Sequence, residues 1–171
     1  AENLKVNHYN NGDEIPTGHT KEEWESLHID RYNGIGTGAY TIYNNDTYYS
    51  NIYGNLYNWY AAMDERGICP EEWRIPSSND WQNILTNYPP ANLAGGKMKE
   101  QGHENWEYSS DEITEQATNE TGFTALPGGI RGWGEEYKDI NKHAYFASTR
   151  FNDYDGLTTS FYLSSTWSSS L

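Results

Sequence analysis

Residues 119–131 read Asn-Glu-Thr-Gly-Phe-Thr-Ala-Leu-Pro-Gly-Gly-Ile-Arg, and this stretch joins a strand signal to a turn signal. Its portion at 122–126 has the composition of a β-strand and runs directly into the turn residues 127–129. Two later stretches, 143–149 and 159–163, are also rich in residues that favour strands. The second half of the chain is therefore predicted to form short strands joined by turns.

The first half of the chain carries helical signals instead. Thr20 and Glu23 have the spacing of a capping box and precede a short amphipathic stretch. A second helix is predicted over residues 55–66, where apolar side chains recur at helical spacing and Gly67 stands at the expected end. Two helices are thus expected before residue 70.

A third helix is predicted to begin at Ser77 or Ser78, since either hydroxyl can cap the first turn. An apolar stripe follows, and the prolines at 89–90 end it. Residues 95–121 show no clean period and are predicted to form an ordered loop. Helices early in the chain and short strands late in it indicate an α+β fold rather than repeated βαβ units.

Length and charge exclude several classes of protein. The chain has 171 residues, which suits one domain with a buried core. The 25 acidic residues against 11 Lys and Arg give a formal net charge of -14, which argues against a nucleic-acid partner because phosphate binding needs clustered cations. No apolar run approaches the roughly 20 residues of a membrane-spanning helix. The 15 Tyr and 7 Trp exceed what a core of this size needs and favour a recognition surface.

Five stretches occur in a distinctive order along the chain. They are Ala-Glu-Asn-Leu-Lys-Val at 1–6, Leu-Tyr-Asn-Trp-Tyr-Ala at 56–61, Cys-Pro-Glu-Glu-Trp-Arg-Ile-Pro at 69–76 followed by Asp-Trp at 80–81, Ala-Gly-Gly-Lys-Met-Lys-Glu at 94–100, and the stretch at 119–131. In this order they resemble the Fibrobacter succinogenes major paralogous domain, a family of bacterial surface and lipoprotein modules. The resemblance implies one domain over residues 1–171 with a C-type-lectin-like fold: two main helices, small antiparallel sheets and long ordered loops that carry ligands.

The chain also departs from the family pattern. Glu72 and Arg74 stand where the family usually has Gly and His, and the family's terminal cysteine-containing strand has no counterpart. The resemblance therefore implies that the domain lacks its C-terminal strand or closes its sheet differently. Cys69 is then either half of a disulfide whose partner lies in the missing strand or a small buried thiol. The Ser-rich tail at 164–170 is expected to be a loop or a frayed end.

The aromatic residues fall into two groups. Those on helical stripes, together with Trp73, are predicted to lie in the core. The others lie in loops beside Gly, acids and amides, where a ring can stack on a sugar while polar neighbours bind its hydroxyls; partial burial under a loop is the alternative. We predict a ligand face built from residues 132–137 and 150–156. Its candidate ligand-binding residues are Trp133, Glu135, Tyr137, Arg150, Asn152, Tyr154 and Trp167.

One segment has the composition of a cation site. Asp153 and Asp155 alternate within Asn-Asp-Tyr-Asp-Gly at 152–156 and are candidate Ca²⁺ ligands, with a solvated acidic turn as the alternative. No histidines stand at metal-ligand spacing, and no Gly-x-Ser-x-Gly elbow anchors a hydrolase triad. No catalytic residue is therefore predicted, and the protein is expected not to be an enzyme.

These observations lead to three hypotheses of function. The first is an extracellular or cell-surface bacterial module for adhesion, which binds a glycan or a surface protein. The second is an assembly module of a surface appendage or lipoprotein complex, in which an open sheet edge accepts a strand from a neighbouring subunit. The third, a carbohydrate-active enzyme, rests only on the abundance of acidic pairs. Neither a nucleic-acid partner nor a membrane-spanning segment is expected.

Overall fold

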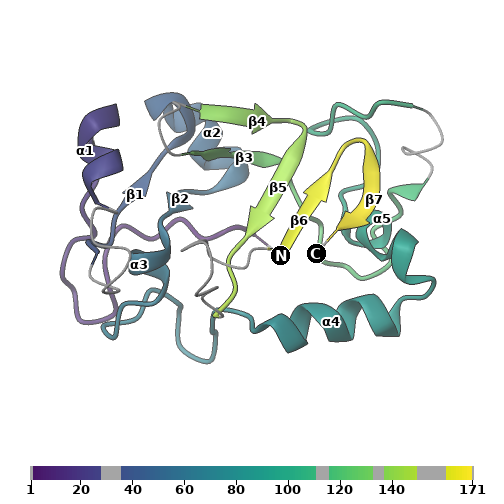
Figure 1. Ribbon diagram of the computed structural model, residues 1–171, viewed down its shortest axis with the longest axis horizontal. Coiled ribbons are helices and arrows are strands. Elements are labelled where there is room, and N and C mark those ends of the chain that lie inside the picture. The colour runs from purple at the N-terminus through teal and green to yellow at the C-terminus, as the bar shows by residue number, and fades with distance from the viewer. Residues whose placement is uncertain (1, 28–35, 111–115, 133–136, 150–160, 171) are drawn as a thin grey trace.

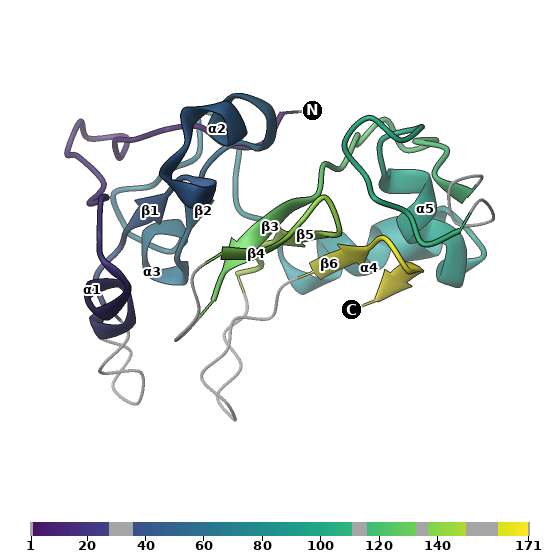
Figure 2. The same cartoon turned by 90° about the horizontal axis from the view of Figure 1, so that it is seen from above.

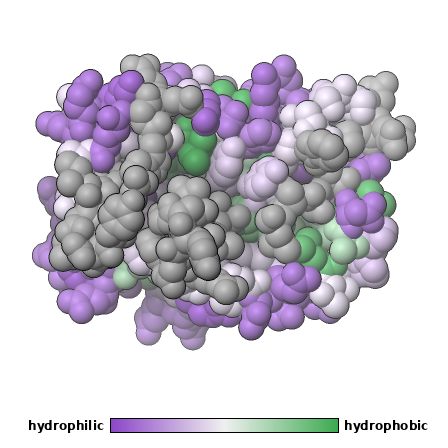
Figure 3. Space-filling view, viewed as in Figure 1, coloured by the Kyte–Doolittle hydropathy of each residue, from purple (hydrophilic) through white to green (hydrophobic). Residues whose placement is uncertain are grey.

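The computed structural model describes residues 2–27, 36–110, 116–132, 137–149 and 161–170. Residues 167–170 are described by their backbone alone. Figures 1 and 2 both place helix α1 at one end of the molecule, helix α5 towards the other, and strands β3 to β6 between them. Hydrophilic residues cover most of the coloured surface in Figure 3, where hydrophobic ones show only in small patches.

The described chain mixes short helices with small antiparallel sheets. The helices are α1 (Lys21–Ser26), α2 (Thr47–Tyr53), α3 (Trp59–Ala62), α4 (Ser78–Asn87) and α5 (Ala94–Met98), with 3₁₀ turns η1 (Tyr43–Asn45) and η2 (Ala91–Leu93). The strands are β1 (Tyr40–Thr41), β2 (Leu56–Tyr57), β3 (Gly128–Arg131), β4 (Tyr137–Ile140), β5 (His143–Phe146), β6 (Phe161–Ser164) and β7 (Trp167–Ser170). They pair as β1-β2, β3-β4 and β5-β6-β7, all antiparallel. The predicted α+β class is confirmed.

Two of the predicted helix starts are confirmed by their caps. The Thr20 hydroxyl accepts from the Glu23 N–H at 3.2 Å, and the Glu23 carboxylate accepts from the Thr20 N–H at 2.8 Å. Ser77 and Asp80 form the same reciprocal pair at the start of α4. Each cap satisfies backbone N–H groups that a helix leaves without intrahelical partners.

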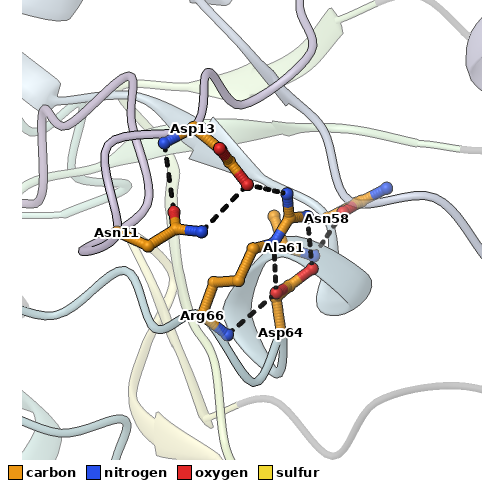
Figure 4. Close-up of polar contacts among 6 residues, drawn as sticks. All are labelled: Asn11, Asp13, Asn58, Ala61, Asp64 and Arg66. Carbon is orange, nitrogen blue, oxygen red and sulfur yellow. Dashed lines mark hydrogen bonds and ion pairs between the residues drawn. The ribbon is translucent and has the colours of Figure 1, made fainter.

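The predicted helix over residues 55–66 is wrong for most of its length. Leu56 and its neighbour form strand β2, and only α3 is helical within this range. Asn58 accounts for the break, since its side-chain oxygen accepts from the N–H groups of Ala39 at 3.0 Å and Ala61 at 2.9 Å. This buried amide caps the shortened helix and also satisfies the backbone of a distant segment. Figure 4 shows its contact with Ala61.

The strand predicted at 122–126 is also displaced. Asn119 closes a turn there, accepting from the Thr124 N–H at 2.8 Å and donating to the Thr124 hydroxyl at 2.9 Å. Only an isolated bridge, from Ala125 to Lys99, lies in this range, and the ladder begins at Gly128, inside the predicted turn. The tail at 164–170 is predicted to be a loop or a frayed end, but it forms the end of β6 and strand β7.

Most of the buried apolar side chains of the described chain form two clusters. The larger contains Trp81, which stacks on Phe161 with ring centroids 4.6 Å apart. Its buried members are Trp81, Leu85, Ala94, Met98, Trp106, Ala125, Ala144, Phe161 and Leu163. The smaller cluster consists of Tyr9, Ile15, Ala61 and Ile68. The segment at 95–121, predicted to be an ordered loop, opens in α5 and supplies Met98 and Trp106 to the larger cluster.

An ion-pair cluster beside the smaller core joins the N-terminal segment to the turn after α3 (Figure 4). Arg66 donates to both oxygens of Asp64 at 2.8 Å and to Asp13 at 3.0 Å. The same guanidinium lies over the ring of Tyr9, 3.9 Å from its centroid. A planar side chain with five donors can make all these contacts at once, which a lysine could not.

This cluster, together with the ion pair of Arg74 and Asp80 at the start of α4, predicts a loss of stability in acid. Hydrogen bonds from Arg66 lower the pKa of Asp64 to about 2, and those from Arg74 hold the pKa of Asp80 well below its usual range. A carboxyl with a depressed pKa in the folded state stabilises the fold above its unfolded pKa of about 4 and loses that contribution as the pH falls further. We expect the melting temperature to fall between about pH 4 and pH 2.

Thermal denaturation of Asp64→Asn checks this expectation. The variant should melt at a lower temperature than the parent at pH 7, and the difference should shrink towards pH 2. The exposed neighbour Glu65 supplies the control Glu65→Gln, which should melt like the parent at pH 7. A difference between Asp64→Asn and the parent that stays constant from pH 7 to pH 2 would contradict the assignment.

Candidate functional site

Most of the predicted ligand face lies outside the described residues. This holds for Trp133, Glu135, Arg150, Asn152 and Tyr154, and for the candidate Ca²⁺ ligands Asp153 and Asp155. Trp167 contributes backbone to β7, but its side chain is not described. Among the described residues, no three His, Cys, Asp or Glu side chains are grouped as a metal site would require. Tyr137 is the predicted ligand residue whose surroundings can be followed.

Tyr137 opens β4 and is held from two sides. Its hydroxyl lies 2.6 Å from the Thr41 hydroxyl and donates to the Asn45 side-chain oxygen at 3.1 Å. Because that oxygen can only accept, Thr41 donates to Tyr137 and the bonds run in one direction. Its ring also packs 5.2 Å from that of the buried Tyr43. These contacts fix the ring of Tyr137 in a single position.

Arg131 lies opposite Tyr137 in the β3-β4 pair. Its guanidinium lies over two rings, 4.6 Å from the centroid of Trp24 and 5.3 Å from that of Tyr137. It donates to the backbone oxygens of His19 at 2.9 Å and Thr20 at 3.1 Å, and to the Thr41 hydroxyl at 3.4 Å. Arg131 therefore joins the segment before α1 to the central strands through both stacking and hydrogen bonds.

A hollow of about 300 Å³ opens beside these two residues. Its lining comes from the loop before α1, the start of α1, the η1 turn and the two strands. The residues are His19, Thr20, Lys21, Asn44, Asn45, Arg131 and Tyr137. We refer to this set as the Arg131 hollow, and it lies at the small end of the size range of ligand sites.

The wall of the Arg131 hollow contains strained backbone. Asn44 and Asn45 both adopt positive φ, at 52° and 56°, a left-handed conformation that asparagine tolerates better than most residues. Non-glycine residues in this region store strain, and they are found preferentially where a backbone is shaped for a ligand. The η1 turn thus places Asn44 and Asn45 in the lining of the hollow.

Sequence reasoning identified one residue of this hollow and missed six. The predicted ligand face began at residue 132, immediately after Arg131, because Gly and aromatic content suggested a loop tip. The strand pairing explains the omission, since it sets Arg131 opposite Tyr137. Alternation along the strand could have indicated that Arg131 and Tyr137 belong to a sheet. Their contacts with Thr41 and Asn45, however, join residues about 90 positions apart. No local pattern could reveal it.

A second polar network lies on the β5-β6 pair. His143 is 3.1 Å from the Ser164 hydroxyl through Nε2 and 3.4 Å from an Asp139 oxygen through Nδ1. The order of groups matches that of a hydrolase triad, but Ser164 is 2% exposed. Its hydroxyl also accepts from the Thr166 N–H at 3.2 Å and bonds to the Thr166 hydroxyl at 2.8 Å. The network closes on itself and serves to hold the two strands together.

Trp73 and Cys69, both in the stretch at 69–76, differ in exposure. Trp73 was predicted to be a core residue, but it is 71% exposed on the turn that follows Pro70, so that prediction is wrong. Glu72 at the same turn has φ of 69°, in the left-handed region. Cys69 is a half-buried free thiol whose pKa is raised by burial. A raised pKa keeps the thiol protonated and unreactive at neutral pH.

The comparisons with known proteins agree with the motif series. The model of the Fibrobacter succinogenes major domain matches residues 1–166. The chain belongs to this bacterial family. The match to the Fibrobacter succinogenes major domain includes all five quoted stretches and every residue of the Arg131 hollow. Neither the comparison with curated proteins nor that with solved structures gave a match.

None of the helices described here is long and apolar enough to cross a lipid bilayer.

Proposed function

We propose that this domain is a non-enzymatic, lectin-like binding module at the bacterial cell surface, and that it recognises a glycan in the Arg131 hollow. The observation that carries the proposal is the convergence of three separate segments on one polar hollow whose central side chains are fixed by stacking and hydrogen bonds. Fixed polar groups bind a ligand with less loss of conformational entropy than mobile ones.

The lining suits hydroxyl-rich ligands. Asn44 and Asn45 carry amides and Thr20 a hydroxyl, and such groups give orientation and specificity in ligand sites. Arg131 adds N–H donors, and its guanidinium is held in position by stacking over the Tyr137 ring. A ligand seated here would touch the loop before α1 and the β3-β4 pair together, and would stabilise their contact.

The burial of the Ser164 hydroxyl and of the Lys99 amine supports a role in recognition rather than catalysis. Catalysis needs groups that reach a reacting atom, yet the Ser164 hydroxyl of the triad-like network is buried and already bonded. Lys99 is also unable to reach a substrate, since its side chain is fully buried and its amine donates to the Ser164 backbone oxygen at 2.5 Å. Burial lowers the pKa of Lys99 to about 8, because an environment without water disfavours the charged amine.

Arg131→Met should reduce glycan binding at least about tenfold, because a charge-assisted hydrogen bond is worth roughly 1.5–3 kcal/mol. A glycan array identifies the bound sugar for the parent domain, and calorimetry then compares the variants. Arg74→Met is the matched control, since Arg74 pairs with Asp80 and does not line the hollow. Equal affinities for the parent and Arg131→Met would refute the proposed site.

Arg131 also holds the segment before α1, so its loss could disturb the fold. Asn44→Gly avoids this difficulty, because Asn44 is exposed and glycine adopts its φ of 52° without strain. Asn44→Gly should weaken binding while leaving the melting temperature near that of the parent. An array on which the parent domain binds no glycan at high concentration would end the proposal itself.

A further inference from the structure

The Arg131 hollow is positively charged in a strongly acidic protein. Acidic residues outnumber Lys and Arg by 25 to 11 over the whole chain. The lining nevertheless holds Lys21 and Arg131, and no Asp or Glu is among the described residues that form it. On α1, the Glu23 carboxylate accepts the Thr20 N–H in the capping box, and neither Glu22 nor Glu25 lines the hollow. The charge of the described lining thus opposes that of the molecule.

The hollow is also richer in hydrogen-bond donors than in acceptors. Arg131 uses three donors of five on described residues. The Asn45 oxygen accepts from Tyr137, which leaves its amide N–H groups for a ligand. The ammonium of Lys21 makes no ion pair with any described residue. A ligand rich in acceptors satisfies this set.

Among acceptor-rich ligands, the lining favours a sugar over an acidic peptide. No aliphatic side chain lines the hollow in the described chain, and peptide sites depend on apolar anchors. Amides, a hydroxyl and a fixed tyrosine instead offer contacts to a ring bearing several hydroxyls. The positive charge of the lining and its polar, non-aliphatic side chains together specify a polyhydroxylated ligand with a negative group.

We infer that the Arg131 hollow selects glycans that carry a carboxylate, such as those containing a uronic or sialic acid. The inference rests on the proposed function and adds the ligand class. The carboxylate lies against Arg131 and Lys21, and the sugar hydroxyls face Asn44, Asn45 and Thr20. Charge-assisted bonds of this kind are about twice as strong as neutral ones.

The net charge of -14 does not prevent this selection at physiological salt. Exposed charges more than about 8 Å away are largely screened at 0.15 M ionic strength, whereas groups in contact are not. The distant carboxylates therefore slow the encounter at low salt, and the contacting cations decide affinity at physiological salt.

Pairs of ligands that differ only in charge test the inference. Tri-galacturonic acid is compared with its trimethyl ester, and sialyllactose with lactose, by calorimetry at 0.15 M salt. We expect the acidic member of at least one pair to bind about tenfold or more tightly than its neutral partner. Lys21→Met should remove most of that preference, because Lys21 is exposed and makes no described ion pair. Lys142→Met, which removes an exposed lysine outside the hollow, should leave it unchanged.

The outcomes separate the two claims. Equal binding of the acidic and neutral partners, or a preference that survives Lys21→Met, overturns the carboxylate inference and leaves the glycan site standing. The carboxylate inference is also overturned if a neutral glycan binds in the hollow and no acidic glycan does. Failure of every ligand, acidic or neutral, on the array as well as in calorimetry, overturns the proposed function together with the inference.

Discussion

Gly129→Ala should lower the free energy of unfolding by about 2–5 kcal/mol, combining the strain of a left-handed alanine with that of an overpacked site. Gly129 has φ of +66°, and an added Cβ would lie 2.5 Å from the Lys138 backbone oxygen and 2.8 Å from the Ile140 nitrogen. Both atoms belong to the backbone of β4 and cannot turn away. Urea denaturation gives the measurement.

Gly122→Ala is the matched control for this effect. Gly122 has a similar φ of +69°, but its added Cβ meets nothing within 4 Å. It should cost only about 1–2 kcal/mol, the price of the left-handed conformation itself. Equal losses in the two variants would show that the close approach of β3 to β4 is not the reason for glycine at 129. Because β3 carries Arg131 and β4 carries Tyr137, Gly129→Ala should also weaken ligand binding.

Trp81→Ala should lower the free energy of unfolding by about 3–5 kcal/mol. Trp81 is 3% exposed, stacks on Phe161 at 4.6 Å, and also contacts the rings of Phe123 and Phe146 at 6.0 and 5.6 Å. Its removal leaves a cavity where α4 packs on the β5-β6 pair, and backbone shifts can fill that cavity only in part.

Trp73→Ala controls for the loss of a tryptophan as such. Because Trp73 is 71% exposed, its replacement should change the free energy of unfolding by no more than about 0.5 kcal/mol. Urea denaturation at equal protein concentration compares the two. A loss in Trp73→Ala as large as that in Trp81→Ala would contradict burial as the cause of the loss in Trp81→Ala.

Local signals in the sequence predicted the parts of the fold that depend on neighbouring residues. The predicted capping box of Thr20 and Glu23 forms, and Ser77, one of the two predicted caps, begins α4, where it forms a second capping box with Asp80. The α+β class followed in the same way from the order of helical and strand-like segments. The family resemblance, resting on motifs at five places, is confirmed over residues 1–166.

Distant contacts account for the predictions that were wrong. Residues 55–66 have the apolar period of a helix, but Leu56 pairs with Thr41 in a sheet and Asn58 is bonded to the backbone of residues 37 and 39. Trp73 was assigned to the core from its neighbours, but it is 71% exposed on a turn in which Glu72 has positive φ. Tertiary context decides such segments, and periodicity alone cannot show it.

The candidate site was predicted in the same uneven way. Tyr137 was identified from loop composition, but its partners Thr41 and Asn45 lie more than 90 residues away. The Arg131 hollow exists only because three separate segments meet, and each of them alone resembles an ordinary polar loop. The lectin-like fold, the surface location and the Ca²⁺ site stay predictions.

The separation of the two apolar clusters has a consequence for how the domain opens. Clusters without a common member can lose their packing separately, so amide hydrogens near Trp81 and those near Tyr9 should exchange with solvent at different free energies of opening. The lower of the two values, rather than the global stability, then sets how readily a protease cuts the folded chain.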